Sequence, residues 1–351
     1  PKEWNALKLL DHRGEFLDAK AGEAILNHVK ANDSVFSAVD DLGQITINDA
    51  YIDLHIEAIL DLDMVDVKAI KKAKFKVVVD GVNSSGGIAV PLLLDALGVQ
   101  TIPLFCNPNG QFPRNPEPLK AHLTDLSQNV IKQKADFGIA VDPDVDRLAF
   151  VCEDGEMFGE EYTLVACADY VLRHTPGATV SNMSSSRALH DVTVKHGQRY
   201  SASAVGEVNV VAMMKATDAV ISGEGNGGVI LPELHYGRDA LVGIALFLSL
   251  LAQNPMKVSA LRQTYPDYFM SKQKVELTPE LDTDALLIQM AKRYQNERVT
   301  TIDGVKIDFN DHWVHLRKSN TEPIIRIYVE APSQDQADAV AQAFITELKS
   351  L

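Results

Sequence analysis

The sequence predicts a multidomain α/β protein that ends in a smaller α+β domain. Its 351 residues are enough for roughly two to three domains of about 150 residues each. A strand, a turn, a helix and a second strand follow one another in two separate stretches of the chain, which is the pattern of an α/β layer. After about residue 271, several strands followed by one helix indicate a separate α+β domain with an antiparallel sheet.

The expected elements follow from hydrophobic periodicity and from the positions of glycine-rich turns. The first α/β stretch contains a strand at 74–79, a turn at 81–87, a helix at 88–97 and a strand at 99–105. The second contains strands at 179–183, 200–204 and 219–222, with helices at 187–197 and 208–216. The last part contains an alternating segment at 272–277, a helix at 285–297, strands at 305–309, 313–316 and 324–330, and a helix at 333–349 that Ser333 caps.

Composition and charge exclude several classes of protein. The chain is 46% hydrophobic and 23% charged, which is typical of a globular protein and not of a disordered one. Its 33 Lys and Arg against 48 Asp and Glu give a net charge of −15, which argues against broad binding of nucleic acid or anionic membranes. Residues 240–252 form the longest apolar run, but it is too short to span a bilayer and indicates a buried core helix.

The three cysteines are scattered through the sequence and include no CxxC motif. This usage suggests neither a disulfide framework nor a zinc site, and it fits a reducing cytoplasm. The sequence also shows no signal peptide or twin-arginine start. We therefore expect a cytoplasmic protein.

The sharpest local motif is the acidic loop, residues 142–147, with the sequence DPDVDR. Asp142, Asp144 and Asp146 crowd three like charges between two apolar runs, which is unfavourable unless a cation neutralises them. Carboxylate oxygens suit a hard cation such as Mg²⁺ or Ca²⁺. From the spacing alone, a solvated acidic turn stays an alternative. An EF-hand is rejected, because it requires glycine where Arg147 stands and helices where strands are expected.

Two further motifs could bind polar ligands. The arginine hairpin, residues 317–326 (RKSNTEPIIR), brings two guanidinium groups, hydroxyls, an amide and turn N–H groups together, which suits phosphate oxygens. The glycine loop, residues 223–228 (GEGNGG), allows a ligand to approach the backbone closely and offers Glu224 and Asn226 to sugar hydroxyls. Taken singly, a polar hairpin turn and a tight structural turn remain alternative interpretations.

In this order along the chain, the three motifs resemble those of the α-D-phosphohexomutase superfamily, which includes phosphoglucomutase, phosphomannomutase and phosphoglucosamine mutase. The similarity extends to residues 204–207 (AVGE) and 237–239 (GRD), and it covers essentially the whole chain. It implies three α/β domains and a smaller α+β domain around a central cleft. The implied segments are 1–55 as the remainder of domain one, 56–158 as domain two, 159–270 as domain three and 271–351 as domain four.

The resemblance also implies a role for each motif. Asp142, Asp144 and Asp146 match the family's Mg²⁺ ligands, and Arg147 matches an arginine near the transferring phosphoryl group. Lys8 matches a basic residue beside the nucleophile and is a candidate general acid/base. Glu224 and Asn226 match sugar contacts. The residues that match the phosphate-binding loop are Arg317, Ser319, Asn320, Thr321 and Arg326.

The implied reaction is the interconversion of hexose or hexosamine 1-phosphate and 6-phosphate through a bisphosphate and a phosphoserine. In relatives this serine lies in a Ser-His-Asn-Pro stretch, and the present sequence, from Pro1 onward, resembles the segment on the C-terminal side of that serine. We therefore expect the serine, and with it most of domain one, to lie upstream of Pro1 and to complete the site.

Asn226, where many gluco- and mannomutases carry serine, favours phosphoglucosamine mutase. The alternatives are a phosphoglucomutase/phosphomannomutase and a phosphosugar-binding homologue without catalysis. A Ca²⁺-binding structural protein would instead place helices around Asp142. The expected partner is a small phosphosugar, with neither nucleic acid nor membrane.

Overall fold

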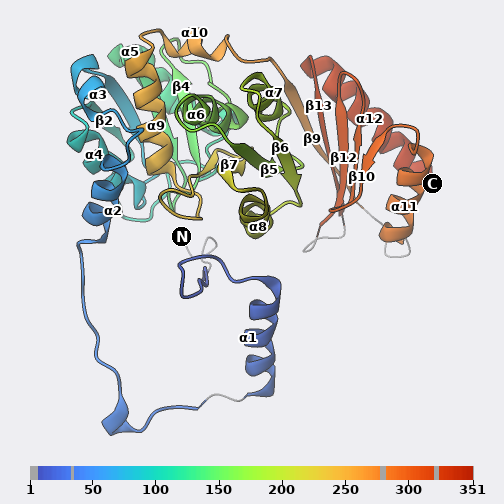
Figure 1. The fold of residues 1–351 in the computed structure, drawn as a ribbon, viewed down its shortest axis with the longest axis horizontal. Coiled ribbons are helices and arrows are strands. Elements are labelled where there is room, and N and C mark those ends of the chain that lie inside the picture. Colours follow the sequence, from blue (N-terminus) through green and yellow to red (C-terminus); the bar gives the residue numbers. More distant parts are fainter. Residues whose placement is uncertain (1–6, 33–34, 277–281, 320–323, 351) are drawn as a thin grey trace. The chain divides into compact units, whose positions relative to one another are not determined.

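The chain divides into two units in the computed structural model (Figure 1). Unit one consists of residues 1–159 and 228–257, and unit two consists of residues 160–227 and 258–351. The structure describes residues 7–32, 35–276, 282–319 and 324–350.

A four-stranded sheet with the order β2-β1-β3-β4 forms the centre of unit one. Its strands are β1 (Lys76–Asp80), β2 (Gln100–Leu104), β3 (Phe137–Val141) and β4 (Leu148–Cys152). β1 runs parallel to β2 and β3, whereas β4 pairs with β3 in the antiparallel direction. The strands expected in the first α/β stretch are confirmed within two residues of their predicted starts. The acidic loop is therefore the connection between two buried, hydrogen-bonded strands.

Unit one also contains helices outside this sheet. They are α1 (Ala19–Ala31), α2 (Tyr51–Leu60), α3 (Val67–Ala73), α4 (Gly86–Ala96), α5 (Thr124–Gln133) and α9 (Ala240–Gln253), with short 3₁₀ turns at Val39–Asp41 and Lys120–His122 and a short strand β8 (Gly228–Ile230). The predicted core helix is confirmed by α9, which is buried from Ala240 to Leu251. Among the described residues, no helix is long and apolar enough to cross a membrane.

A cluster of four phenylalanine rings, one of them on α9, packs this helix against the sheet of unit one. Phe247 of α9 stacks on Phe150 of β4 with ring centroids 3.8 Å apart. Its edges also meet Phe137 and Phe158 at 5.7 and 5.3 Å. Such aromatic pairs add stabilisation beyond the burial of their area. Because Phe150 belongs to one of the two strands that carry the acidic loop, this packing also fixes the base of that loop.

Unit two begins with a parallel sheet in which β5 lies between β6 and β7. The strands are β5 (Ala178–Asn182), β6 (Tyr200–Ser203) and β7 (Ala219–Glu224). The helices are α6 (Glu160–His174), α7 (Ala188–Lys195), α8 (Glu207–Thr217) and α10 (Val258–Arg262). Because parallel strands end at the same edge of a sheet, the ends of β5 and β7 bring Asn182 and Glu224 together.

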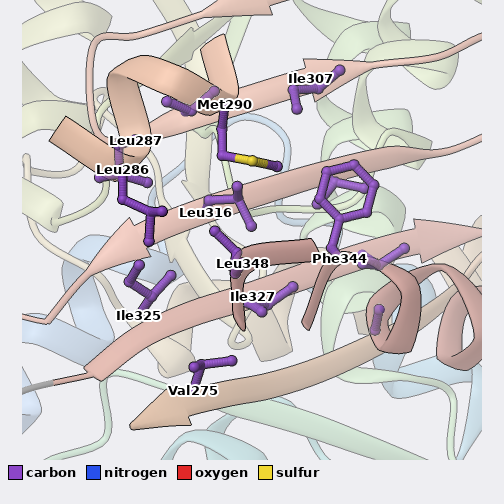
Figure 2. Close-up of a cluster of buried hydrophobic side chains, with 14 of the residues drawn as sticks. Val275, Leu286, Leu287, Met290, Ile307, Leu316, Ile325, Ile327, Phe344 and Leu348 are labelled. Carbon is purple, nitrogen blue, oxygen red and sulfur yellow. The ribbon is translucent and has the colours of Figure 1, made fainter. Parts of the chain in front are cut away.

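The last part of unit two is an antiparallel sheet with the order β10-β11-β12-β13-β9. It contains β9 (Phe269–Glu276), β10 (Arg298–Thr300), β11 (Val305–Asp308), β12 (Trp313–Lys318) and β13 (Ile324–Ala331), with helices α11 (Thr283–Arg293) and α12 (Gln334–Ser350). Figure 2 shows apolar side chains of the sheet meeting Met290 of α11 and Phe344 of α12. Ser333 caps α12 as predicted, since its Oγ accepts a hydrogen bond from the N–H of Gln336.

We expect Phe247→Ala to lower the free energy of unfolding of unit one by about 3–5 kcal/mol, because it removes a buried ring that three other rings contact. Urea denaturation followed by circular dichroism measures this loss. Ile131→Ala, in a side chain that is 55% exposed on α5, is the control and should cost less than about 1 kcal/mol. Equal losses in the two variants would contradict the role of the aromatic cluster.

Candidate active site

The acidic loop folds around the side chain of its first residue. Asp142 Oδ1 accepts hydrogen bonds from the backbone N–H groups of Asp146 and Arg147, both at 3.0 Å. The loop joins β3 to β4, which pair directly on either side of it. Because strands flank Asp142, the helix-flanked site of a Ca²⁺-binding structural protein does not fit. The rejection of an EF-hand is thus confirmed.

The three aspartates form a cluster with the composition of a cation site. One carboxylate oxygen from each of Asp142, Asp144 and Asp146 lies within 4.8 Å of the others. Burial, followed by the charges of the other two aspartates, raises the pKa of Asp142 to about 8. Asp146 Oδ1 is buried and accepts no hydrogen bond from any described residue. A divalent cation would satisfy this oxygen and neutralise the crowded charge, so the residues present fit a metal such as Mg²⁺.

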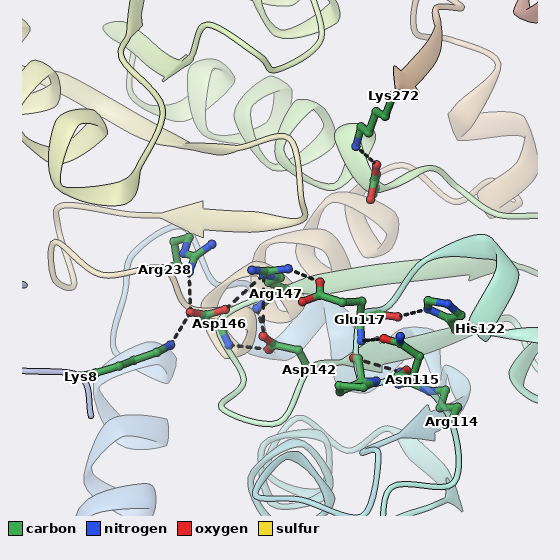
Figure 3. Close-up of polar contacts among 12 residues, drawn as sticks. Lys8, Arg114, Asn115, Glu117, His122, Asp142, Asp146, Arg147, Arg238 and Lys272 are labelled. Atoms are coloured by element: carbon green, nitrogen blue, oxygen red, sulfur yellow. Dashed lines mark hydrogen bonds and ion pairs between the residues drawn. The ribbon is translucent and has the colours of Figure 1, made fainter. Parts of the chain in front are cut away.

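Three basic side chains reach this cluster from different parts of unit one (Figure 3). Lys8 hydrogen bonds with Asp144 and, at 2.9 Å, with Asp146 Oδ2. Burial lowers the pKa of Lys8, but its bonds to the two carboxylates outweigh burial and raise the pKa. Arg238 Nη2 donates to Asp146 Oδ2 at 2.7 Å. Arg147 pairs with Glu117, and its Nε lies 3.8 Å from Asp146 Oδ1.

The backbone of the acidic loop is strained and held from two sides. Val145 has φ of +63°, in the left-handed region that a β-branched residue rarely adopts. The hydroxyls of Ser84 and Ser85 both donate to the carbonyl of Pro143 at 2.7 Å. The N–H of Ala240, at the start of α9, donates to the carbonyl of Val145 at 3.0 Å. The loop therefore keeps its shape through contacts with the turn after β1 and with α9.

A histidine pair supports the same end of α9. Asp239 caps the helix, because its Oδ1 accepts hydrogen bonds from the N–H groups of Leu241 and Val242, at 2.7 and 3.3 Å. Its Oδ2 lies 2.7 Å from His55 Nε2 and 3.2 Å from His235 Nε2. The hydrogen bond to Asp239 raises the pKa of His55. Burial raises the pKa of Asp239, but its bonds to the two histidines outweigh burial and lower it below its ordinary range.

The glycine loop follows β7, and its first residues belong to unit two. Glu224 Oε1 accepts a hydrogen bond from Asn182 Nδ2 at 2.8 Å. The N–H of Gly225 donates to Ser185 Oγ at 2.9 Å, and Ser185 in turn donates to Asn182 Oδ1. One buried amide therefore orients both Glu224 and the loop backbone. Asn226 lies in the following turn and is half-buried.

Gly225 is required by its surroundings. A Cβ at this position would collide with the carboxylate of Glu161, which belongs to α6 and accepts a hydrogen bond from the N–H of Ser186 at 2.8 Å. Burial raises the pKa of Glu161 to about 8. The loop backbone thus lies directly against a buried carboxyl group, so a side chain at this position would force either Glu161 or the loop to shift.

The arginine hairpin brings its two arginines side by side. Arg317 of β12 is paired in register with Arg326 of β13, and residues directly opposite one another lie on the same face of a sheet. Arg317 Nε also lies 2.8 Å from a carboxylate oxygen of Asp303. Like charges in direct opposition are unfavourable, and an anion would relieve them. Ser319 is buried and its N–H donates to the carbonyl of Ile324, whereas Asn320 and Thr321 lie outside the described residues.

Several side chains that orient the predicted site residues lie outside the three sequence motifs. Asn182, Asp303, Glu117 and Arg238 each orient a predicted residue, yet each stands outside the motif that it supports. Asn182 and Glu224 have a common signal in the sequence, since both end strands of one predicted parallel sheet. Arg238 lies just before the apolar helix, within the GRD stretch at 237–239 that resembles the family, but that resemblance assigned it no role.

Comparison with known proteins identifies the family. Three models of the phosphoglucomutase/phosphomannomutase family match the chain: alpha/beta/alpha domain II over residues 50–155, alpha/beta/alpha domain III over 159–268, and the C-terminal domain over 274–347. The chain therefore belongs to the phosphoglucomutase/phosphomannomutase family, within the α-D-phosphohexomutase superfamily that its motifs resemble.

Individual relatives agree with this assignment. The chain is 36% identical to a phosphoglucomutase/phosphomannomutase of Thermococcus kodakarensis, over 96% of this chain and 74% of the relative. It is 31% identical to a probable phosphoglucosamine mutase of Methanopyrus kandleri, over 98% of this chain and 76% of that one. The solved structure of a family protein from Burkholderia thailandensis matches with a TM-score of 0.79 at 26% identity, over 95% of this chain and 70% of that chain. These relatives are named as mutases or as members of the mutase family, and the chain is accordingly an enzyme of this class.

We expect His55→Gln to destabilise unit one more at pH 5.5 than at pH 8.5. The folded state raises the pKa of His55, so the charged pair with Asp239 contributes fully below the unfolded pKa of about 6.5 and is lost as pH rises through the folded value. The lowered pKa of Asp239 keeps its carboxylate charged over this range.

Thermal unfolding of the wild type and of the variant at both pH values measures the effect, with a difference of about 1 kcal/mol between the two conditions. His12→Gln, which alters an exposed histidine of the same unit, is the control and should behave alike at both pH values. A His55→Gln effect that is independent of pH would contradict the charged pair.

Proposed function

We propose that this protein is a Mg²⁺-dependent phosphohexomutase that interconverts hexose or hexosamine 1-phosphate and 6-phosphate through a bisphosphate intermediate. The observation that carries the proposal is the acidic cluster of unit one, in which the buried Asp146 Oδ1 has no hydrogen-bond partner among the described residues and lies 3.8 Å from Arg147 Nε. The paired Arg317 and Arg326 of unit two add a candidate site for the phosphate that does not react.

Asp142, Asp144 and Asp146 are the proposed ligands of the metal. When bound, Mg²⁺ would stabilise negative charge on the oxygens of the transferring phosphoryl group. Arg147 is placed to act on the same group, because its Nε is buried with no hydrogen-bond partner among the described residues. Glu117 holds the other end of this guanidinium, which limits its rotation.

Lys8 is the proposed general acid/base. It is the more exposed of the basic groups at Asp146, with 44% of its side chain accessible against 10% for Arg238. Its ammonium already pairs with the two carboxylates that the metal would bind. In this proposal, the ammonium of Lys8 donates a proton to the sugar oxygen in one direction of the reaction, and the resulting amine takes a proton from the sugar hydroxyl in the other.

Substrate recognition is assigned to unit two. Glu224, held by Asn182, accepts hydrogen bonds from sugar hydroxyls, and Asn226 offers both a donor and an acceptor. Arg317 and Arg326 bind the phosphate that is not transferred, because guanidinium groups match its oxygens in pairs. Ser319, Asn320 and Thr321 supply additional donors. Asn226 favours glucosamine phosphate as the substrate, with glucose or mannose phosphate as the alternatives.

The phosphorylated serine is proposed to come from polypeptide outside residues 1–351. Apolar side chains between residues 35 and 47 support this part of the proposal, since Val35 and Ile45 are each 96% exposed and Phe36 is 89% exposed. Several exposed apolar groups within one segment favour contact with another segment of polypeptide. A cytoplasmic location is also proposed, in keeping with three free cysteines.

The decisive experiment is a mutase assay on the protein as the cell makes it, with the 1-phosphates of glucosamine, glucose and mannose as substrates and with Mg²⁺ present. We expect the highest kcat/KM with glucosamine 1-phosphate. Asp144→Asn should lower kcat about 100-fold, because it weakens charge stabilisation of the transferred group. Asp154→Asn, in an exposed turn after β4, is the matched control. Absence of turnover with all three substrates would exclude the enzyme and favour a phosphosugar-binding homologue.

Phosphosugar binding tests the arginine hairpin separately. We expect Arg317→Ala to raise the Kd for glucosamine 1-phosphate about 10- to 150-fold, since a charged hydrogen bond contributes about 1.5–3 kcal/mol. Isothermal titration calorimetry measures this change. Arg298→Ala removes an exposed guanidinium from the same sheet and should leave the Kd unchanged. An unaltered Kd in Arg317→Ala would remove the hairpin from the substrate site.

A further inference from the structure

We propose that Arg238 is a positioning residue for the metal site: it holds Asp146 so that Oδ1 of that carboxylate faces the cation. This inference rests on the proposed metal site and extends it to a residue outside the acidic loop. Figure 3 shows Arg238 and Lys8 both reaching the carboxylate of Asp146.

The two oxygens of Asp146 have different surroundings. Oδ2 accepts hydrogen bonds from Arg238 Nη2 at 2.7 Å and from Lys8 Nζ at 2.9 Å. Oδ1 accepts none from the described residues, although it is buried. A buried carboxylate oxygen left without a hydrogen-bond partner carries a desolvation cost, which a cation would remove. Arg238 therefore satisfies one oxygen and leaves the other as the metal-facing atom.

The backbone at Arg238 is held in place, because the next residue, Asp239, makes hydrogen bonds through both its N–H group and its side chain. The N–H of Asp239 donates to the carbonyl of Val229 at 2.8 Å, and its side chain caps α9 while accepting from His55 and His235. Arg238 itself is only 10% exposed in its side chain. Lys8, with 44% exposure, lacks this confinement. Of the two, Arg238 is therefore the partner that stays at Asp146 when a cation binds.

The same segment also contacts the strained residue next to Asp146. Ala240 N–H bonds to the carbonyl of Val145, whose φ is +63°. Two consecutive residues of the acidic loop are thus held from one segment: Ala240, the first residue of α9, holds Val145, and Arg238, two residues earlier, holds Asp146. Strained backbone persists only where the surroundings fix it, and here α9 provides that support.

Charge and position predict opposite effects of removing Arg238. If the guanidinium acted only through its charge, a neutral residue would leave the acidic cluster more negative and would tighten binding of a divalent cation. If it acts by orienting Asp146, a neutral residue releases the carboxylate and weakens binding, by about tenfold for a typical residue behind a metal ligand. We expect the second result.

The test is titration of the chain with Mn²⁺, in which electron paramagnetic resonance reports the free ion and Mg²⁺ is added as a competitor. Arg238→Met should raise the Kd for Mn²⁺ about tenfold, and Arg238→Lys, which keeps a charged donor, should raise it less. Arg199→Met, which removes an exposed arginine, is the matched control. Circular dichroism establishes that each variant is folded, and if Arg238→Met is not, Arg238→Lys alone must still weaken binding.

Asp144→Asn in the same titration separates this inference from the function on which it rests. Weaker Mn²⁺ binding in Asp144→Asn with an unchanged or tighter Kd in Arg238→Met would overturn the role of Arg238 and leave the metal site standing. Unchanged binding in Asp144→Asn would overturn the metal site itself.

Discussion

Mutual repulsion among the carboxylates of Asp142, Asp144 and Asp146 is the constraint that the rest of the candidate site in unit one must offset. Two unit charges about 4 Å apart interact by roughly 4 kcal/mol at the effective dielectric constant of a protein surface. The chain offsets this repulsion with backbone N–H groups at Asp142, with Arg147 and Arg238, and with the ammonium of Lys8. Positive groups from distant parts of the sequence therefore converge on the loop and act together with the hydrogen bonds that hold its backbone.

Unit two also brings like charges together, but here the charges are positive. Arg317 and Arg326 lie opposite one another in an antiparallel pair, and Asp303 balances part of their charge. In both units, charged groups proposed to bind a ligand, the aspartates of the acidic loop and Arg317, therefore have partners of opposite charge. The proposed ligands, a cation in one case and a phosphate in the other, would replace or complement those partners, and binding then requires little rearrangement of the backbone.

Local patterns predicted most strands of the fold and the central motifs of the candidate site. Apolar runs on either side of DPDVDR indicated β3 and β4, and alternation from residue 272 indicated β9. The predictions omitted β10, because Arg298–Thr300 is too short to show a period. They also omitted α6, although Glu160–His174 is buried along most of its length. A helix that is apolar on several faces has a weak amphipathic pattern, and only its neighbours in the fold explain its burial.

Long-range contacts could not be derived in this way. Arg238 and Asp146 are 92 positions apart, and Asn182 and Glu224 are 42 apart. Sequence shows that each is polar, but the pairing depends on which strands and helices end at one edge of a sheet. The left-handed backbone conformation of Val145 could not be predicted either, since a β-branched residue rarely has a positive φ.

The position of α9 in the chain has a consequence for how the protein assembles. Unit one is interrupted after residue 159 and resumes only at residue 228, so its central helix is synthesised after β5, β6 and β7 of unit two. During synthesis on the ribosome, Phe137 of β3 and Phe150 of β4 emerge before Phe247. The apolar surface that Phe247 covers stays exposed until α9 has been made. The aromatic packing of unit one is thus completed only after α9 has been synthesised, and apolar surface exposed before that point favours aggregation of the nascent chain.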